Sequence, residues 1–273
     1  MFARISRTFA TLAIAVTSVI FFTAAEAQTV RYVASNGLNS NNCIRAAPCL
    51  TLQRGINRTP AGGELQILDS GFYGSEVIID KSITISAVGV SATLGGIIVD
   101  APGATVVLRG LLLNGTSAPG LSSGMAVEAA AVVHIVNCEI ERFPGSGIVI
   151  TALLAEVFIS QTTARSNGLH GLLLLGSYGT KTIVNSRFEN NGSSGIHISG
   201  PSRVMVEHSV SSHNGTRGLF VANSGFATIS NSLFTFNNIG LENSDSILYS
   251  RKNNTLNRNV TETVGFITTL GGY

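Results

Sequence analysis

A glycine followed by alternating apolar residues returns five times along this chain at nearly constant spacing. The glycines are Gly147, Gly171, Gly195, Gly218 and Gly240, and the steps between them are 24, 24, 23 and 22 residues. Self-similarity at a fixed period of about 20 to 50 residues is typical of repeat architectures, whose units bury their apolar faces only by stacking on one another. The spacing therefore predicts a solenoid.

Two polar columns keep the same period. The first holds Asn137, Gln161, Asn185, His208 and Asn231. The second lies six residues further on and holds Phe143, Asn167, Asn191, Asn214 and Asn237. Stacked asparagines can pass amide hydrogen bonds from rung to rung, and asparagine tolerates the left-handed backbone of sharp corners. We interpret the second column as architectural.

Small residues follow the first polar column and predict a tight interior corner. They are Cys138, Thr162, Ser186, Ser209 and Ser232. Under this interpretation Cys138 is a buried side chain and not a nucleophile.

The apolar residues of each repeat alternate with period two, which predicts strands and not helices. Short strands joined by Gly, Asn and Ser turns form parallel sheets whose rungs stack about 4.8 Å apart. Weaker repeats at Gly124, Gly96 and Gly74 extend the count to about eight coils. Residues 114–123 lengthen one coil and must bulge outward. The predicted fold is an all-β, single-stranded parallel β-helix.

The N-terminus has the pattern of a secretory signal peptide. Arg4 and Arg7 precede an apolar run that ends at the small residues around Ala27. We expect a signal peptide over residues 1–27, a lead-in and cap over 28–60 and the β-helix domain over 61–273. A membrane anchor is the alternative, but polar residues interrupt the run, and no later segment is long and apolar enough to span a bilayer. We expect a secreted or periplasmic protein without stable membrane insertion.

Charge and cysteine usage narrow the class further. Without the leader, 15 basic and 14 acidic side chains remain, which disfavours a nucleic-acid partner because phosphate binding needs clustered Lys and Arg. Cys43 and Cys49 indicate a disulfide in an exported protein. A zinc site would require about four ligands, and no second Cys or His pair lies nearby. Residues 49–56 could form a short amphipathic helix that caps the core.

The chain resembles the right-handed parallel β-helix proteins of the pectin-lyase-like superfamily. The segment from Tyr32 to Gln53 looks like the family's N-terminal lead-in, and the segments starting at Asn185 and Asn231 look like its coil consensus. The resemblance covers most of the mature chain. It implies right-handed winding, which also follows from the preference for right-handed parallel crossovers. The superfamily includes lyases, hydrolases, esterases and epimerases of acidic polysaccharides as well as noncatalytic proteins, so fold does not fix function.

The motifs of the catalytic members are missing from this sequence. It lacks a calcium-binding acidic cluster with a catalytic Arg or Lys, the polygalacturonase Asp-Asp and Gly-His-Gly signatures, the epimerase Asp-Pro-His-Asp and the pectin-esterase Gln/Asp/Arg set. The resemblance implies the scaffold and leaves the chemistry open.

One constellation of weak catalytic candidates follows from the register. Asp100 and Glu128 each lie four residues after a column glycine, so the register predicts two outward carboxylates about 5 Å apart. Such a pair often binds a cation or shares a proton. Arg109 is expected nearby, and the loop of residues 114–123 could form one wall. Surface carboxylates are common, so a solvated pair is the alternative. No cofactor or metal is expected, with calcium as the one alternative.

A second set of candidates faces outward two residues after the column glycines. These ligand-face candidates are Val149, Leu173, His197, Phe220 and Glu242. The apolar members predict a stripe that could contact a ligand or another chain. His197 and Glu242 lie two rungs apart, too far for a hydrogen bond. His170 and Arg217, just before the glycines, are interpreted as solvated.

The sequence thus predicts an exported β-helix protein that binds extracellular or envelope polysaccharide, or another cell-surface component, or has a structural surface role. The alternative is a polysaccharide lyase or glycoside hydrolase with an atypical site at Asp100, Glu128 and Arg109.

Overall fold

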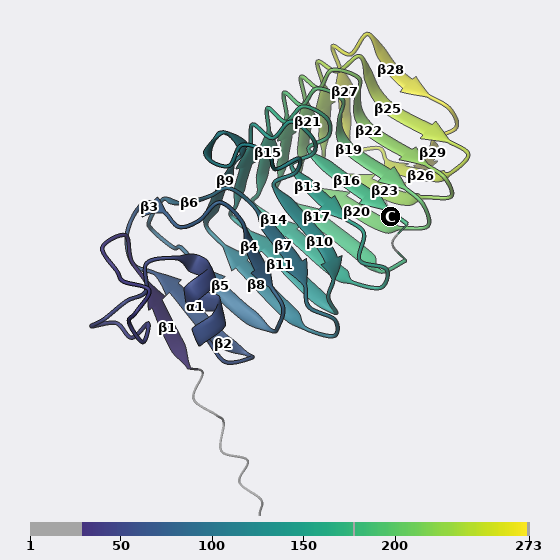
Figure 1. The fold of residues 1–273 in the computed structure, drawn as a ribbon. Coiled ribbons are helices and arrows are strands. Elements are labelled where there is room, and N and C mark those ends of the chain that lie inside the picture. Colours follow the sequence, from purple (N-terminus) through teal and green to yellow (C-terminus); the bar gives the residue numbers. More distant parts are fainter. Residues whose placement is uncertain (1–28, 177, 272–273) are drawn as a thin grey trace, which may run out of the picture.

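The computed structural model describes residues 29–176 and 178–271, and these residues form an elongated stack of short parallel strands (Figure 1). Each coil contributes one strand to each of three sheets. Sheet 1 has eleven strands, and sheets 2 and 3 have nine each. The stack has about nine turns, close to the eight predicted. The signal peptide predicted over residues 1–27 lies outside the described residues.

The three sheets follow one another along every coil in the order 1, 2, 3. Sheet 1 contains β1 (Val30–Val33), β2 (Gly63–Ile67), β5 (Ile83–Ser86), β8 (Thr105–Arg109), β11 (Val132–Val136), β14 (Glu156–Ser160), β17 (Thr180–Val184), β20 (Arg203–Glu207), β23 (Phe226–Ser230), β26 (Ile247–Arg251) and β29 (Thr268–Leu270). Sheet 2 contains β3 (Gly71–Phe72), β6 (Ala92–Leu94), β9 (Leu111–Asn114), β12 (Glu139–Glu141), β15 (Thr163–Arg165), β18 (Arg187–Glu189), β21 (Val210–Ser212), β24 (Leu233–Thr235) and β27 (Thr255–Asn257). Sheet 3 contains β4 (Val77–Ile79), β7 (Ile97–Asp100), β10 (Met125–Ala129), β13 (Ile148–Ile150), β16 (Leu172–Leu175), β19 (Ser194–Ser199), β22 (Arg217–Ala222), β25 (Ile239–Ser244) and β28 (Thr261–Val264).

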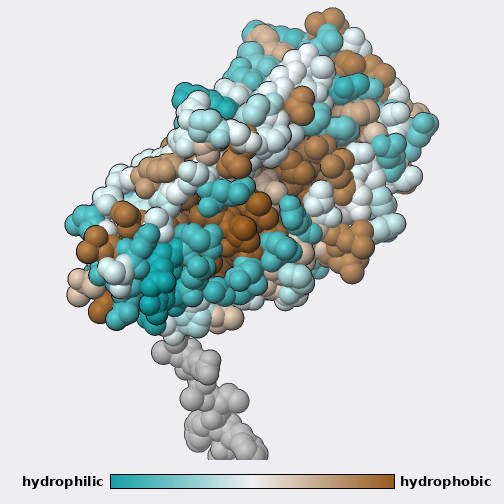
Figure 2. Space-filling model, in the orientation of Figure 1, coloured by the Kyte–Doolittle hydropathy of each residue, from teal (hydrophilic) through white to brown (hydrophobic). Residues whose placement is uncertain are grey.

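The core is a continuous column of inward-facing aliphatic side chains. On sheet 3, Ile148, Leu172 and Ile196 are paired in register and fully buried. The residue that follows each of them on its own strand faces out. On the outside, hydrophobic side chains gather over part of the face formed by the strands of sheet 3 (Figure 2). Burying one such core side chain contributes about 1.5 to 3 kcal/mol, so the stacked rungs supply the stability that a single coil lacks.

The asparagine column is a buried ladder. The Nδ2 of Asn167 donates to the Oδ1 of Asn191 at 3.0 Å, and the same contact joins Asn191 to Asn214 and Asn214 to Asn237, each at 3.0 Å. The ladder ends at Asn259. The left-handed backbone, which we expected at the ladder itself, is found one residue earlier, for example at Asn190 with φ 57°. The ladder therefore supplies hydrogen bonds, and its neighbour turns the chain.

The glycine column exists because the ladder passes beside it. A Cβ placed on Gly195 would lie 2.7 Å from the Nδ2 of Asn214, and one on Gly218 would lie 2.8 Å from that of Asn237. The carbonyl of the next glycine is equally close, at 2.6 Å for Gly218. Only glycine leaves room for both. One expected position was wrong: Val77 pairs with Ile97, so Glu76 and not Gly74 aligns with Gly96.

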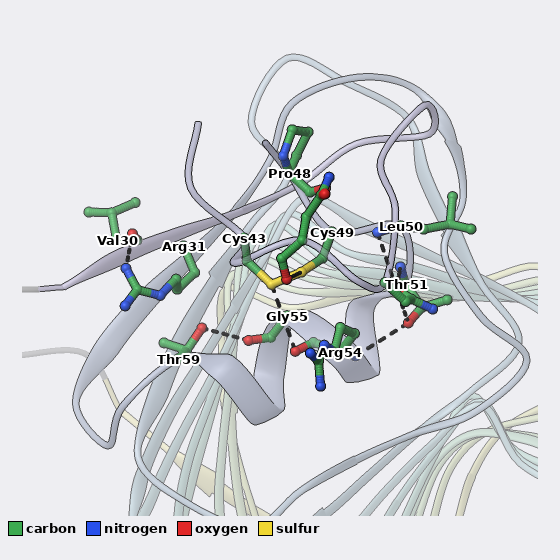
Figure 3. Close-up of a disulfide and its surroundings, with 12 residues drawn as sticks. Val30, Arg31, Cys43, Pro48, Cys49, Leu50, Thr51, Arg54, Gly55 and Thr59 are labelled. Atoms are coloured by element: carbon green, nitrogen blue, oxygen red, sulfur yellow. Dashed lines mark hydrogen bonds between the residues drawn. A yellow bond between two sulfur atoms is a disulfide. The ribbon is translucent and has the colours of Figure 1, made fainter. Parts of the chain in front are cut away.

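The residues at the N-terminal end form a cap, as predicted. Helix α1 (Leu52–Arg58) buries Leu52 and Ile56 at the end of the solenoid (Figure 1). The Thr51 hydroxyl caps the helix by accepting the Arg54 backbone N–H at 3.3 Å. Cys43 and Cys49 form the expected disulfide beside this helix (Figure 3). In the described part of the chain, no helix is long and apolar enough to cross a membrane.

Candidate functional site

The ligand-face candidates lie side by side on the outer face of sheet 3. Strand register pairs Val149 with Leu173, Leu173 with His197, His197 with Phe220, and Phe220 with Glu242. All five are half-buried. The same column continues through Ala126, Ile98 and Ile78 on the preceding rungs. The apolar stripe is therefore present and longer than predicted, while its role as a ligand face stays a prediction.

Two histidines meet on this face. The Nε2 of His170 lies 3.3 Å from the Nδ1 of His197, and the backbone N–H of Ser194 donates to the Nδ1 of His170 at 3.2 Å. Because a backbone N–H only donates, the Nδ1 of His170 carries no proton, and a neutral His170 holds its proton on Nε2. That proton is donated to His197. The neutral His197 then carries its own proton on Nε2, where it is a donor for a further group.

Their surroundings keep both imidazoles neutral. Partial burial, together with the neighbouring His197 and Arg217, lowers the pKa of His170 from 6.5 to about 4. Burial and then Arg217 lower the pKa of His197. A depressed histidine pKa means that the charged form is the disfavoured one. At neutral pH this pair offers hydrogen bonds and no charge.

A fixed arginine completes the cluster. The Nε of Arg217 lies 2.5 Å from a carboxylate oxygen of Glu242, and its guanidinium lies 4.3 Å from the centre of the Phe220 ring. Phe220 in turn packs on His197, with ring centres 4.8 Å apart. None of the described contacts uses the two terminal nitrogens of Arg217. The Ser194 hydroxyl is buried and has no hydrogen-bond partner among the described residues. We call His170, Ser194, His197, Arg217, Phe220 and Glu242 the sheet 3 cluster.

The interpretation of His170 and Arg217 as solvated side chains was wrong. His197 and Glu242 do lie two rungs apart, but each contacts a residue from the rung before its own. His170 and His197 are one repeat plus three residues apart, and so are Arg217 and Glu242. A residue just before the glycine therefore reaches the outward residue two places after the next glycine. This offset is visible in the sequence and marks residues on neighbouring rungs, but it does not define the side-chain rotamers that bring them into contact.

The weak catalytic candidates do not gather. Ile97 pairs with Met125, so Gly96 and Gly124 are in register as expected, but an irregularity after Val127 pairs Asp100 with Ala129. The added residue removes Glu128 from the position facing Asp100. Both carboxylates are exposed.

Arg109 ends β8 in sheet 1, where it pairs with Val136. Thr105, the first residue of that strand, follows the turn after Asp100, so the strand carries Arg109 about 13 Å further away. The expectation that Arg109 lies near the two carboxylates is not supported. Among the described residues, no three His, Cys, Asp or Glu side chains are grouped so that they could hold a metal ion.

The long loop of residues 114–123 packs beside the turns that join sheet 2 to sheet 3. Asn114 caps the short 3-10 helix η1 (Gly115–Ser117), and Ala118 is buried close to Gly95. The carbonyl of Ser122 accepts the backbone N–H of Gly145 at 2.7 Å. One rung further on, the backbone N–H of Leu169 donates to the carbonyl of Gly145 at 2.9 Å. The loop therefore lies two rungs before the sheet 3 cluster, about 10 Å along the axis.

The fold and this face define the class: a parallel β-solenoid with an open, partly apolar side that carries a polar cluster. A model described as "Right handed beta helix region" matches residues 96–272, more than half of the chain. The chain belongs to the right-handed β-helix family, and its winding is right-handed as predicted. No protein of curated function matches the sequence.

Solved structures show the same fold. The pectate lyase Pel9A is 16% identical, with a TM-score of 0.64, over 91% of this chain and 80% of that one. XylC, solved in complex with xylose, is 11% identical, with a TM-score of 0.67, over 89% and 70%. The periplasmic alginate epimerase AlgG is 12% identical, with a TM-score of 0.50, over 77% and 63%. At these identities the likeness concerns the fold and leaves the chemistry of this chain to its own residues.

Proposed function

We propose that this chain is an exported protein that binds a carboxylate-bearing polysaccharide along the outer face of sheet 3. The observation that carries the proposal is the fixed guanidinium of Arg217. Glu242 and Phe220 hold it in place, and its two terminal nitrogens remain available on a half-buried surface. Two parallel N–H groups of a guanidinium match the two oxygens of a carboxylate, which makes arginine the preferred partner of such a group.

The neighbouring groups suit the rest of a sugar. The Nε2–H of His197 supplies a hydrogen-bond donor one rung from Arg217. Leu173 and Val149 continue the face as an apolar floor for ring C–H groups. The strands repeat about every 4.8 Å along an open face, so a long chain can lie across several rungs.

The similar structures and the disulfide support this direction. Two of those structures are named a pectate lyase and an alginate epimerase, and pectate and alginate are both carboxylate-bearing polysaccharides. The Cys43–Cys49 disulfide suits an oxidising compartment. We favour binding over turnover because the proton-accepting nitrogen of each histidine is already occupied, Nδ1 of His170 by Ser194 and Nδ1 of His197 by His170.

The test is the affinity of hexagalacturonate and a mannuronate hexamer for the wild type and for Arg217→Met, measured by calorimetry. A charge-assisted hydrogen bond contributes about 1.5 to 3 kcal/mol, so the variant should bind at least about tenfold more weakly. Arg203→Met is the matched control, because Arg203 also stacks on a phenylalanine, Phe226, but lies on sheet 1. Equal losses in the two variants, or none in Arg217→Met, would contradict the proposal.

A further inference from the structure

A second surface, on sheet 2, has the shape and chemistry of a binding site that is separate from the sheet 3 cluster. Residues with left-handed backbone stand near both ends of its strands β12, β15, β18, β21 and β24. One row contains Asn137, Gln161, Asn185, His208 and Asn231, with φ between 48° and 52°, and the other contains Arg142, Ser166, Asn190, His213, Phe236 and Arg258, with φ between 55° and 62°. All are exposed. We call the surface between the two rows the sheet 2 valley.

The valley is hollowed along its length. A hollow of about 420 Å³ is lined by Asn137 and Gln161 of the first row together with Glu139 and Thr163 of the floor. Another of about 390 Å³ continues along the same row past Asn185, His208 and Asn231. A third, also about 390 Å³, lies against the opposite row at Asn190, His213 and Phe236. The hollows thus follow consecutive rungs, spaced about 4.8 Å apart.

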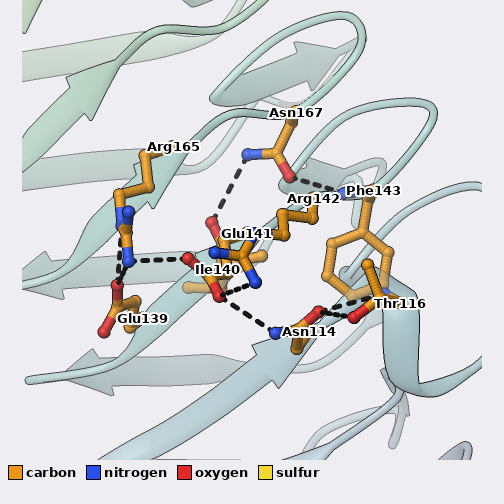
Figure 4. Close-up of polar contacts among 9 residues, drawn as sticks. All are labelled: Asn114, Thr116, Glu139, Ile140, Glu141, Arg142, Phe143, Arg165 and Asn167. Atoms are coloured by element: carbon orange, nitrogen blue, oxygen red, sulfur yellow. Dashed lines mark hydrogen bonds and ion pairs between the residues drawn. The ribbon is translucent and has the colours of Figure 1, made fainter.

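The floor is polar, internally paired and partly buried. Arg165 bridges Glu139 at 2.5 Å and Glu141 at 2.6 Å, and Glu141 also accepts the Asn114 amide at 2.9 Å (Figure 4). Glu141 is only 4% exposed although it faces outward. One rung further on, Arg187 pairs with Glu189 at 2.5 Å, and the Ser212 hydroxyl donates to Glu189 at 3.3 Å.

Apart from Arg258, the charges of the valley cancel. Arg142, Arg165 and Arg187 face Glu139, Glu141 and Glu189, and the arginines bond these carboxylates directly. The row that begins with Asn137 adds amides and an imidazole, which both donate and accept hydrogen bonds. A surface of this kind offers little to a polyanion and many partners to hydroxyl groups.

The opposite rim carries an apolar edge under strain. Phe236 is 43% exposed and has a φ of 55°, a conformation that is unusual for a bulky residue. Its ring stacks on His213 with centres 4.6 Å apart, and Arg258 lies 5.2 Å from its centre on the next rung. The faces of the ring are covered, so its edge is what borders the hollow. Such an edge makes van der Waals contact with a sugar ring without face-on stacking.

We propose that the sheet 2 valley binds a neutral polysaccharide whose chain runs parallel to the solenoid axis. The inference goes beyond the function proposed for sheet 3 and does not depend on it. With both surfaces occupied, one molecule would join a neutral and an acidic glycan, because sheets 2 and 3 are separate faces of the same stack.

The test uses cellohexaose, xylohexaose and mannohexaose as probes in calorimetric titrations of the whole protein. The double variant Asn185→Gly, Phe236→Asn removes one amide of the first row and the apolar edge of the second row. Glycine and asparagine both tolerate the positive φ of these positions. Asn223→Gly is the matched control, since Asn223 is also exposed, with φ 54°, but lies outside the valley at the end of sheet 3.

We expect at least one neutral hexamer to bind saturably, with at least a tenfold loss in the double variant and no change in Asn223→Gly or Arg217→Met. The proposal is overturned if none of the three binds or if the double variant leaves the affinity unchanged. The proposal is also overturned if the double variant loses its binding of hexagalacturonate but keeps its affinity for the neutral hexamers. A failure of the sheet 3 proposal would instead appear only in Arg217→Met with acidic hexamers.

Discussion

Replacing Asn191 by alanine tests the ladder on which the whole repeat depends. The Asn191 side chain is 1% exposed and makes four hydrogen bonds. Its Nδ2 donates to the Oδ1 of Asn214 at 3.0 Å and to the carbonyl of Ala164 at 3.2 Å. Its Oδ1 accepts the side-chain and backbone N–H groups of Asn167 at 3.0 and 3.2 Å.

The expected loss follows from the groups that the substitution leaves behind. Asn191→Ala strands two donors of Asn167 and one acceptor, on Ala164, inside a dry core, whereas the Asn214 Oδ1 still accepts the backbone N–H of residue 191. A buried polar group without a partner costs about 1 to 3 kcal/mol. At the lower end of that range, three such groups lower the free energy of unfolding by about 3 kcal/mol.

Equilibrium unfolding in urea, followed by circular dichroism, measures this loss. Asn238→Ala is the matched control, because Asn238 is an exposed asparagine whose side chain makes no hydrogen bond with the described residues. Its substitution should change the free energy of unfolding by no more than about 0.5 kcal/mol. A loss below about 1 kcal/mol for Asn191→Ala would refute the argument that the ladder is a stabilising element.

Three further results are expected. Replacing Cys43 and Cys49 by serine together should lower the free energy of unfolding by about 2 kcal/mol, the chain-entropy value for so short a loop, and an unchanged urea midpoint would contradict this. For His170, whose pKa falls from 6.5 to about 4 on folding, the unfolded chain binds the proton more readily, so its contribution to stability is full above about pH 6.5 and is lost as the pH falls towards 4. Urea midpoints measured at both pH values should therefore differ less in His170→Gln than in the wild type, whereas an equal difference would show that this histidine is not the titrating group. Incubation with polygalacturonate or alginate, with calcium or with chelator, should release no unsaturated or reducing-end products; sustained release would identify an enzyme and direct mutagenesis to the sheet 3 cluster, then to Asp100 and Glu128.

The repeat could be predicted from the sequence because each of its columns has a local physical cause. Period two in the apolar residues gives the strands, the asparagines give the ladder, and the glycines give the space beside it. The N-terminal cap was equally accessible, since the Cys43–Cys49 pair and the amphipathic pattern around Leu52 and Ile56 lie close together in the chain.

The candidate site was less predictable because it depends on where side chains lean. His170 and His197 belong to different columns, and only the tilt of one ring along the axis brings them to 3.3 Å. In the same way, Asp100 was placed opposite Glu128 by counting residues, and one extra residue in the paired strand removed that contact. Counting residues along the repeat assigns a residue to a rung, but it does not predict β-bulges or side-chain rotamers.

The buried position of Lys181 could not be predicted from the alternation of apolar and polar residues. Its position on β17 faces inward between Val157 and Val204, and the side chain is fully buried. Its Nζ reaches the carbonyl of Gly179 at 2.7 Å, and burial lowers the pKa of the amine to about 8. A strict period-two pattern assigns this position to an apolar residue. The nearby carbonyl that makes lysine tolerable is visible only in the folded chain.

The most direct test of the central claim is a crystal structure of this protein with hexagalacturonate bound. We predict electron density across the outer face of sheet 3, with one carboxylate of the sugar within hydrogen-bond distance of the terminal nitrogens of Arg217. A hexamer bound elsewhere on the solenoid, with Arg217 contacting only Glu242 and Phe220, would contradict the account.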